Sequence, residues 1–214
     1  MASRNISDIH TIIQFLERKE RGTFTNPSQI DMLLNMAQME VYEDYFKMYG
    51  IDQTVHDAIN PFKVNYQFTS AADGTVTLPE DYLHLLPNVF TVTGSTINEV
   101  HFLNEDEWVL AIKSQLRPVT LTTPIAKDYG NGFNLYPQSL QVGFLTYMRR
   151  PLTPVYSYTQ VGRTITYDPT TSVQIEFSDV YIDKIIAKAL GYLGINLSER
   201  DITEFGLLKD KETT

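Results

Sequence analysis

The side chains that could carry chemistry are scattered along this 214-residue chain. Its four histidines, His10, His56, His84 and His101, lack the i, i+4 helical spacing and the clustered carboxylates that a metal site requires. The chain has no cysteine, which excludes disulfides, thiolate metal ligands and a cysteine nucleophile. We therefore expect no metal and no cofactor, and we expect ordinary surface or half-buried histidines.

Three other groups fit a structural role better than a chemical one. Asp81 lies near His84, but no G-x-S-x-G motif supplies a nucleophile, which disfavours a hydrolytic site. Residues 128–132, DYGNG, have the oxygen ligands of a calcium loop, yet a hairpin turn uses the same residue types for positive φ angles. The acidic run 105–107 is typical of a helix amino terminus. We predict no catalytic residue and no enzyme.

Arg149 and Arg150 form the only adjacent arginine pair. Arginine forks bind phosphate or carboxylate in bidentate fashion, so the pair could contact DNA or an acidic protein neighbour. Because the chain has a formal net charge of −9, a protein carboxylate or plain solvent is the favoured partner. Both arginines are candidates for a protein interface.

Composition narrows the function classes further. Seventeen Lys and Arg against twenty-six Asp and Glu oppose general affinity for nucleic acid or anionic membrane. The amino terminus lacks the features of a secretory signal, and no run reaches the roughly 20 apolar residues that span a bilayer. We expect a soluble protein that is made in the cytoplasm and has no membrane partner.

The best-defined predicted element is a long helix over residues 27–49. Asn26 is a suitable N-cap, Pro27 suits the first turn, and Gly50 is expected to end the helix in a left-handed conformation. Apolar residues at i, i+3, i+4 and i+7 spacing predict one core-facing stripe. This stripe consists of Ile30, Leu33, Leu34, Ala37, Val41 and Tyr45.

The same helix has a second apolar stripe, roughly half a turn away from the first. Its members are Met32, Met36, Met39 and Phe46. Methionine adapts to irregular contact surfaces, so these residues are interface candidates for a neighbouring subunit. Burial within the same chain is the alternative.

Other helices flank this one. A first helix is expected over residues 7–19, capped by Ser7, followed by a solvated charged turn over residues 17–22, and a short helix over residues 53–59 is expected to end at Asn60. Ser178 and Gly194 predict the ends of a carboxy-terminal helix that packs on the long one. A last short helix after residue 198 adds the interface candidates Ile202, Phe205 and Leu208.

The middle of the chain is typical of β structure. Alternating residues 64–68, a turn at 72–74 and the return 75–78 predict a hairpin. Further strands are expected over residues 86–93, 97–103, 120–129, 133–136, 141–148 and 164–177. Asn104 and Glu107 predict a capping box for a short helix over residues 105–114, with Trp108, Val109 and Ile112 facing inward.

The predicted fold class is therefore α+β. Residues 1–61 form a helical part, and residues 178–214 return to it, so that both ends make a small helical bundle. Residues 62–177 form an inserted antiparallel β sandwich or barrel.

Several segments, in order, resemble the neck proteins of tailed bacteriophages, above all the ring or adaptor proteins of short-tailed, crAss-like phages. The segments are NMAQMEVYEDYF, TLPEDYLHL, NLYP, VGFLTYMRRPLTPVY and VQIEFSDVYIDKIIAKALGYLGINLSERDITEFG. The most useful matches are the turn at 78–82, Tyr136-Pro137 and the run 147–154. These are packing and turn motifs and not catalytic ones.

The resemblance implies a structural virion protein, located in the neck between capsid and tail. Such a protein forms a cyclic homo-oligomer, implied to be a dodecamer, as a head-to-tail connector. Its implied partners are copies of itself, the portal protein and adjacent neck or tail rings. Genomic DNA would pass through the lumen without specific binding.

Two other classes remain open on the sequence. The first is a carbohydrate- or ligand-binding β domain of a receptor-binding or cell-surface protein, which would need an exposed aromatic platform or a cation site. The second is an enzyme, for which the sequence offers no reaction centre.

Overall fold

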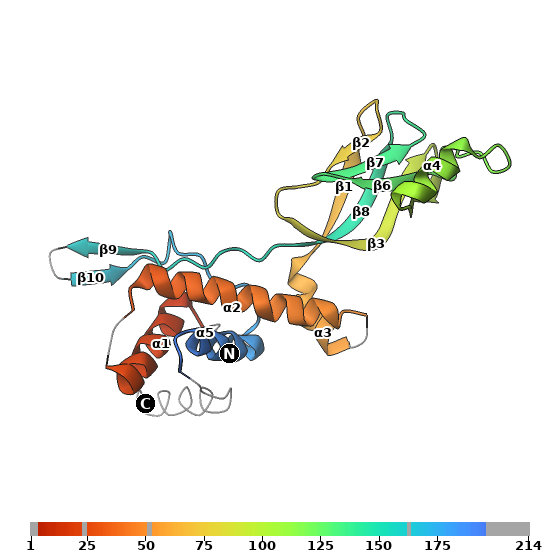
Figure 1. The fold of residues 1–214 in the computed structure, drawn as a ribbon. Coiled ribbons are helices and arrows are strands. Elements are labelled where there is room, and N and C mark those ends of the chain that lie inside the picture. Colours follow the sequence, from red (N-terminus) through yellow and green to blue (C-terminus); the bar gives the residue numbers. More distant parts are fainter. Residues whose placement is uncertain (1–3, 23–24, 51–52, 162–163, 196–214) are drawn as a thin grey trace. The chain divides into compact units, whose positions relative to one another are not determined.

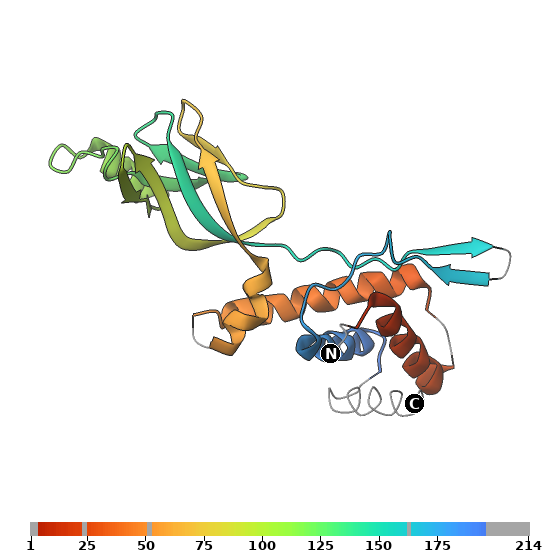
Figure 2. The same cartoon turned by 180° about the vertical axis from the view of Figure 1, so that it is seen from behind.

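A computed structural model describes residues 4–22, 25–50, 53–161 and 164–195. The chain divides into two compact units, both drawn in Figure 1 and, from behind, in Figure 2. The helical unit comprises Met1–Pro61 and Pro151–Thr214, and the sandwich unit comprises Phe62–Arg150. The α+β class is confirmed, because the strands of an inserted β domain come between amino-terminal and carboxy-terminal helices along the chain.

The first helix, α1 (Ile6–Arg21), begins one residue before the expected cap at Ser7. Asn5 is the cap instead, because its side chain accepts from the Asp8 backbone while the Asp8 carboxylate accepts from Asn5. Gly22, at φ 67°, ends the helix.

The expected charged turn at 17–22 is wrong, since most of that run belongs to α1. Glu17 is only 2% exposed, and its carboxylate accepts from the Thr25 backbone N–H at 2.9 Å and from the Thr25 hydroxyl at 2.5 Å. A buried carboxylate is tolerated when such donors satisfy it. Glu17 thereby links α1 to the chain just before the next helix.

The long helix is α2 (Pro27–Lys47). Asn26 caps it as predicted, with Gln29 completing a capping box. Its end differs from the prediction, because Gly50 is not in a left-handed conformation. The Met48 and Tyr49 N–H groups donate to carbonyls three residues earlier, and such bonds tighten the last turn without a left-handed residue.

The carboxy-terminal helix α5 (Asp179–Tyr192) packs on α2, as predicted. Gly194, at φ 77°, follows it, but the Ser178 side chain makes no capping bond. The buried residues of the helical unit come from one side of each helix, although Leu33 and Tyr45 of the predicted stripe are only half-buried. On α2 and α5 they are Ile30, Leu34, Ala37, Gln38, Val41, Tyr42, Ile182, Ile185, Ile186, Ala189 and Leu190.

A polar cluster joins the outer edges of α2 and α5. The Lys188 ammonium donates to Glu40 at 2.5 Å and to Asp44 at 3.1 Å, and the Tyr192 hydroxyl donates to Glu40 at 2.6 Å. The hydrogen bond from Lys188 lowers the pKa of Glu40, and the hydrogen bond to Glu40 raises the pKa of Tyr192. The cluster is exposed, so its contribution to stability is small.

The short helix α3 (Gln53–Ile59) lies where it was predicted, and the 3₁₀ turn η1 (Asn60–Phe62) follows it.

The predicted carboxy-terminal domain boundary at residue 177 is wrong, because the unit boundary lies at Arg150. The return segment, residues 151–177, belongs to the helical unit. Gln38 of α2 donates to the Leu152 carbonyl at 2.8 Å, and both Asp31 carboxylate oxygens accept from the Tyr156 N–H at 3.1 Å.

Only a small part of this return segment is β structure. The strands β9 (Tyr158–Val161) and β10 (Thr164–Tyr167) form a two-stranded hairpin. The rest of the predicted strand 164–177 contributes an isolated bridge between Val155 and Val173. The segment therefore belongs to the helical unit, where the Gln174 side chain accepts from the Ile6 N–H at 2.7 Å, and not to the sandwich.

The sandwich unit has two four-stranded sheets and no closed barrel. The first contains, in spatial order, β1 (Lys63–Thr69), β8 (Val142–Arg149), β3 (Tyr82–Thr93) and β4 (Thr96–Glu99). The second contains β2 (Thr75–Thr77), β7 (Gly132–Tyr136), β6 (Ile125–Tyr129) and β5 (His101–Phe102). All pairs are antiparallel except β5 with β6. The core between the sheets is Phe68, Val76, Val89, Val100, Ala126, Phe133, Leu135, Leu145 and Tyr147.

The predicted hairpin and two predicted strand boundaries are wrong. β1 pairs with β8 and β2 with β7, so these two strands are not a hairpin. The turn between them ends at Gly74, at φ 85°, where an added Cβ would lie 2.2 Å from the Leu135 carbonyl oxygen. Likewise, the predicted strand 97–103 divides at buried Val100 into β4 and β5, and the strand expected from residue 120 starts at Ile125.

The inserted helix is α4 (Glu105–Lys113), with the predicted capping box between Asn104 and Glu107. Trp108 is buried, with its ring 6.1 Å from that of Tyr136. Val109 and Ile112, predicted to face inward, are 40% and 37% exposed. The helix packs on β6, and Leu110 is also 70% exposed, so Trp108 is the buried residue of this helix.

The Asp31 contacts predict a measurable loss of stability on substitution. Asp31→Asn replaces one acceptor oxygen by an NH₂ group, which cannot accept from His10 or from the Tyr156 N–H. We expect the free energy of unfolding to fall by about 1–3 kcal/mol. Urea denaturation followed by the helical circular dichroism signal measures it. Asp128→Asn, at an exposed position, is the control, and equal effects of the two changes would contradict the structure.

Candidate assembly surfaces

The outer side of α2 exposes two methionines one turn apart. Met32 is 57% exposed and Met36 is 47% exposed, whereas Leu34 and Ala37 on the opposite side are fully buried. Large apolar side chains at neighbouring positions of a regular helix are typical of a surface that another protein covers. We call Met32 and Met36 the methionine pair.

The rest of the predicted second stripe is covered in part by its own chain. Met39 and Phe46 are half-buried. The Phe46 ring stacks with Tyr42 at 6.5 Å and with Tyr49 at 6.2 Å between centroids. The stripe is therefore exposed mainly at its amino-terminal half, where the methionine pair lies.

Arg149 and Arg150 differ in their surroundings. The Arg149 guanidinium lies 5.5 Å from the centroid of the Phe62 ring and also donates to the Arg150 carbonyl at 3.3 Å. The Arg150 side chain is exposed, and its backbone N–H donates to the Asp81 carbonyl at 2.7 Å. Arg150 thus remains the more accessible interface candidate.

Asp81 has a structural partner. Its carboxylate accepts from the Tyr147 hydroxyl at 2.8 Å, and Tyr82 N–H closes the preceding turn on the Pro79 carbonyl. Burial, together with this hydrogen bond, raises the pKa of Tyr147 to about 12. Asp81 therefore holds the predicted 78–82 turn against β8.

The remaining interface candidates, Ile202, Phe205 and Leu208, lie outside the described residues.

A second apolar surface lies on the outward face of the first sheet, and the sequence analysis did not identify it. In the strand register Phe90 faces Phe144, Val92 faces Val142, and Val92 also faces Ile97. Ile97, Val142 and Phe144 are 68%, 36% and 47% exposed, while Phe90 and Val92 are half-buried. Residues directly opposite one another point to the same side of a sheet, so the five form one patch. We call it the sheet patch.

A signal for the sheet patch was present in the sequence. The sequence of β8 is VGFLTYMR, and both faces of this strand have apolar residues. Leu145 and Tyr147 face the core, whereas Val142 and Phe144 face outward. A strand with one solvated face normally alternates apolar and polar residues. The missing alternation was the sign of an apolar outward face.

One histidine differs from the prediction. His10 is only 3% exposed, and its Nε2 lies 2.8 Å from an Asp31 carboxylate oxygen while its ring stacks on Tyr156 at 4.5 Å. His56 stacks on Tyr49 at 4.2 Å. Within the described ranges, no three His, Asp or Glu side chains converge as metal ligands.

The predicted turn over residues 128–132 is confirmed. Tyr129 pairs with Gly132 across the β6–β7 hairpin, and Gly130, at φ 52°, occupies the left-handed region. Its Asp, Asn and Gly residues therefore serve turn geometry.

The contrast between the two sides of α2 gives a stability prediction. Leu34→Ala should lower the free energy of unfolding by about 2–5 kcal/mol, because it leaves a cavity in the core. Met36→Ala should change it by no more than about 0.5 kcal/mol, because the side chain is about half exposed and lies outside the core. Denaturant titration of the two variants measures both values, and a large loss for Met36→Ala would place that residue in the core.

No protein-family model matches the chain, and no curated protein matches it. Among the described helices, none is long and apolar enough to cross a membrane. The functional conclusion must follow from the two exposed apolar surfaces, the charge and the sequence pattern.

Proposed function

We propose that this chain is a structural subunit that assembles with copies of itself into a ring in the neck of a bacteriophage, between the capsid and the tail. The observation that carries the proposal is the methionine pair, which is exposed on a helix whose opposite side is fully buried. An apolar surface of this kind is stabilised when a protein neighbour removes it from water.

The sheet patch supports a ring over an isolated two-fold dimer. A two-fold dimer uses one self-complementary surface, whereas a ring subunit offers one surface to the preceding copy and a different one to the next. The methionine pair lies in the helical unit and the sheet patch in the sandwich unit, so the chain has two separate apolar surfaces. One of them could equally contact a ring stacked above or below.

The phage assignment rests on the resemblance of the ordered segments, which implies a dodecameric head-to-tail connector. In this proposal the portal protein and the adjacent neck or tail rings are the other partners. The excess of carboxylates, multiplied around a closed ring, would keep the wall of the lumen from binding the phosphate backbone of DNA. DNA would then pass without being held.

Met36→Glu tests the assembly role. The variant should stay folded as a monomer, because the side chain is exposed there, and it should lose ring assembly, because an unpaired charge would be buried only at the interface. Sedimentation velocity and negative-stain electron microscopy, at concentrations where the unchanged protein forms rings, measure the loss.

Two variants control this experiment. Met36→Leu keeps an apolar side chain and should assemble, while Val180→Glu adds the same charge at a residue of α5 that is 80% exposed. Rings that persist in Met36→Glu would exclude the methionine pair from the interface. A chain that stays monomeric under all conditions would contradict the ring itself.

The charge makes a separate prediction about DNA. The free protein should show negligible binding to duplex DNA at physiological salt, since few phosphates can be neutralised by a chain of net charge −9. Electrophoretic mobility shifts at low and at moderate salt measure the binding. Tight binding with a steep salt dependence would contradict a lumen that does not bind DNA. Arg150 would then be a candidate for a DNA contact.

A further inference from the structure

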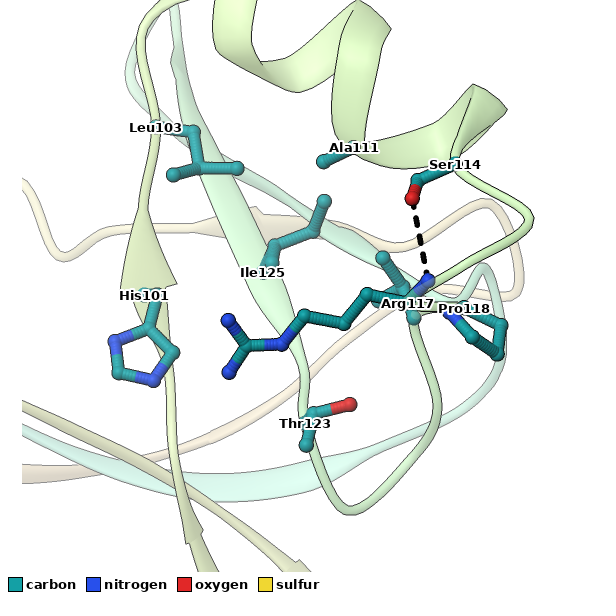
Figure 3. Close-up of a pocket in the computed structure, with 9 residues that line it drawn as sticks. His101, Leu103, Ala111, Ser114, Arg117, Pro118, Thr123 and Ile125 are labelled. Atoms are coloured by element: carbon teal, nitrogen blue, oxygen red, sulfur yellow. Dashed lines mark hydrogen bonds between the residues drawn. The ribbon is translucent and has the colours of Figure 1, made fainter.

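The sandwich unit contains a pocket that no part of the proposed function uses. It has a volume of about 400 Å³ and lies between α4, β5, the start of β6 and the connecting loop. Figure 3 shows the Arg117 side chain extending from that loop across the pocket toward His101 on β5. A volume of this size suits a small ligand or one or two side chains of a partner.

The walls of the pocket are mainly apolar. Leu103, Ala111, Pro118, Val119 and Ile125 supply them, and Ile125 is buried while Leu103, Ala111 and Val119 are half-buried. The polar lining residues are His101, Ser114, Arg117 and Thr123, and Figure 3 shows the Arg117 guanidinium directed toward His101 while Ser114 lies at the other side of the pocket. Such a combination fixes the orientation of a ligand that has one polar end and one apolar end.

Arg117 supplies the charged group of this pocket. Its backbone N–H donates to the Ser114 hydroxyl at 3.2 Å, which ties the loop to the end of α4 (Figure 3). Its guanidinium makes no ion pair with any carboxylate in the described part of the chain. This is notable in a chain with twenty-six acidic residues, because a nearby carboxylate would be the ordinary partner.

The geometry points to a binding site for a carboxylate that carries an apolar group. The carboxylate would accept from the Arg117 fork, with the His101 ring beside it, and the apolar group would lie on Leu103 and Ile125. Guanidinium binds carboxylates in a planar, bidentate manner, and the apolar walls disfavour a fully hydrated anion such as phosphate. This inference does not depend on ring assembly.

Two sources could supply this chemistry. One is a free small-molecule acid, and the other is the carboxylate of a protein segment, either a terminal carboxylate after an apolar residue or an acidic side chain beside one. The experiment needs probes for both, and a readout that does not depend on activity.

Trp108 provides that readout. It is the only tryptophan of the chain and lies on α4, one turn before the pocket residue Ala111. Its fluorescence, together with isothermal titration calorimetry, should detect the full chain binding sodium benzoate or the tripeptide Ala-Ala-Leu. Matched neutral probes are benzamide and the same tripeptide with an amidated carboxyl terminus, and inorganic phosphate is the hydrated anion.

Arg117→Gln should weaken binding of the carboxylate probe about tenfold or more, because it removes the charge-assisted hydrogen bonds. Arg150→Gln removes an exposed arginine of the same unit and should leave binding unchanged. Circular dichroism should be unaltered in both variants, since both side chains are exposed. An unfolded Arg117→Gln would be replaced by Arg117→Lys, which keeps the charge, loses the planar fork and should also bind more weakly.

The outcomes distinguish a small-molecule acid from a protein carboxylate, and some of them would overturn the proposed site. Binding of benzoate supports a small-molecule acid, and binding of the free tripeptide alone supports a protein carboxylate. If inorganic phosphate binds as tightly as the carboxylate probes, the pocket is a general anion site. That result would overturn the inference that the ligand carries an apolar group. Binding of no probe, equal binding of the neutral probes, or an Arg117→Gln variant that binds normally would overturn it entirely.

Discussion

The helical unit depends on one carboxylate. Asp31 of α2 accepts from the Tyr156 backbone N–H through both oxygens, and one of them also lies 2.8 Å from Nε2 of buried His10 on α1. Three segments that are distant in the sequence therefore meet at a single side chain. The stacking of His10 on Tyr156 covers this site, and a shielded hydrogen bond of this kind is costly to leave unmade. Together with the Gln38 bond to the Leu152 carbonyl, it holds the return segment against the helices.

Elements that are apolar on two sides are the second recurring theme. On α2, Leu34 faces the core while Met36 faces outward, and on β8, Leu145 faces the core while Phe144 faces outward. In both elements one side lies in the core, and the other side is wholly or partly exposed in the single chain. A subunit built this way is suited to gain burial from neighbouring copies, which is the physical basis of the proposed ring. The Arg117 pocket is different in kind, since an exposed arginine extends across a small pocket whose walls are mainly apolar.

Much of the fold followed from local sequence signals. The cap of α2 at Asn26, the capping box of α4 and the left-handed Gly194 each depend on residues within one turn, so the sequence alone was sufficient to locate them. The α+β class, the helical packing of the two ends and the turn at Gly130 also followed from periodicity and turn chemistry. The second apolar stripe of α2 was visible in the spacing, but the sequence left its burial open, and only the structure shows that Met32 and Met36 are its exposed members.

Contacts between distant residues were decided only by the tertiary structure. The sequence indicated that β1 and β2 are strands, yet their pairing with β8 and β7 depends on the crossing at Gly74, which a period of two does not encode. The burial of Glu17 and His10, the boundary at Arg150 and the Arg117 pocket have the same origin. Capping and turn energies arise between neighbours in sequence, whereas strand partners and the burial of charged groups depend on which remote donors and apolar side chains the fold brings near.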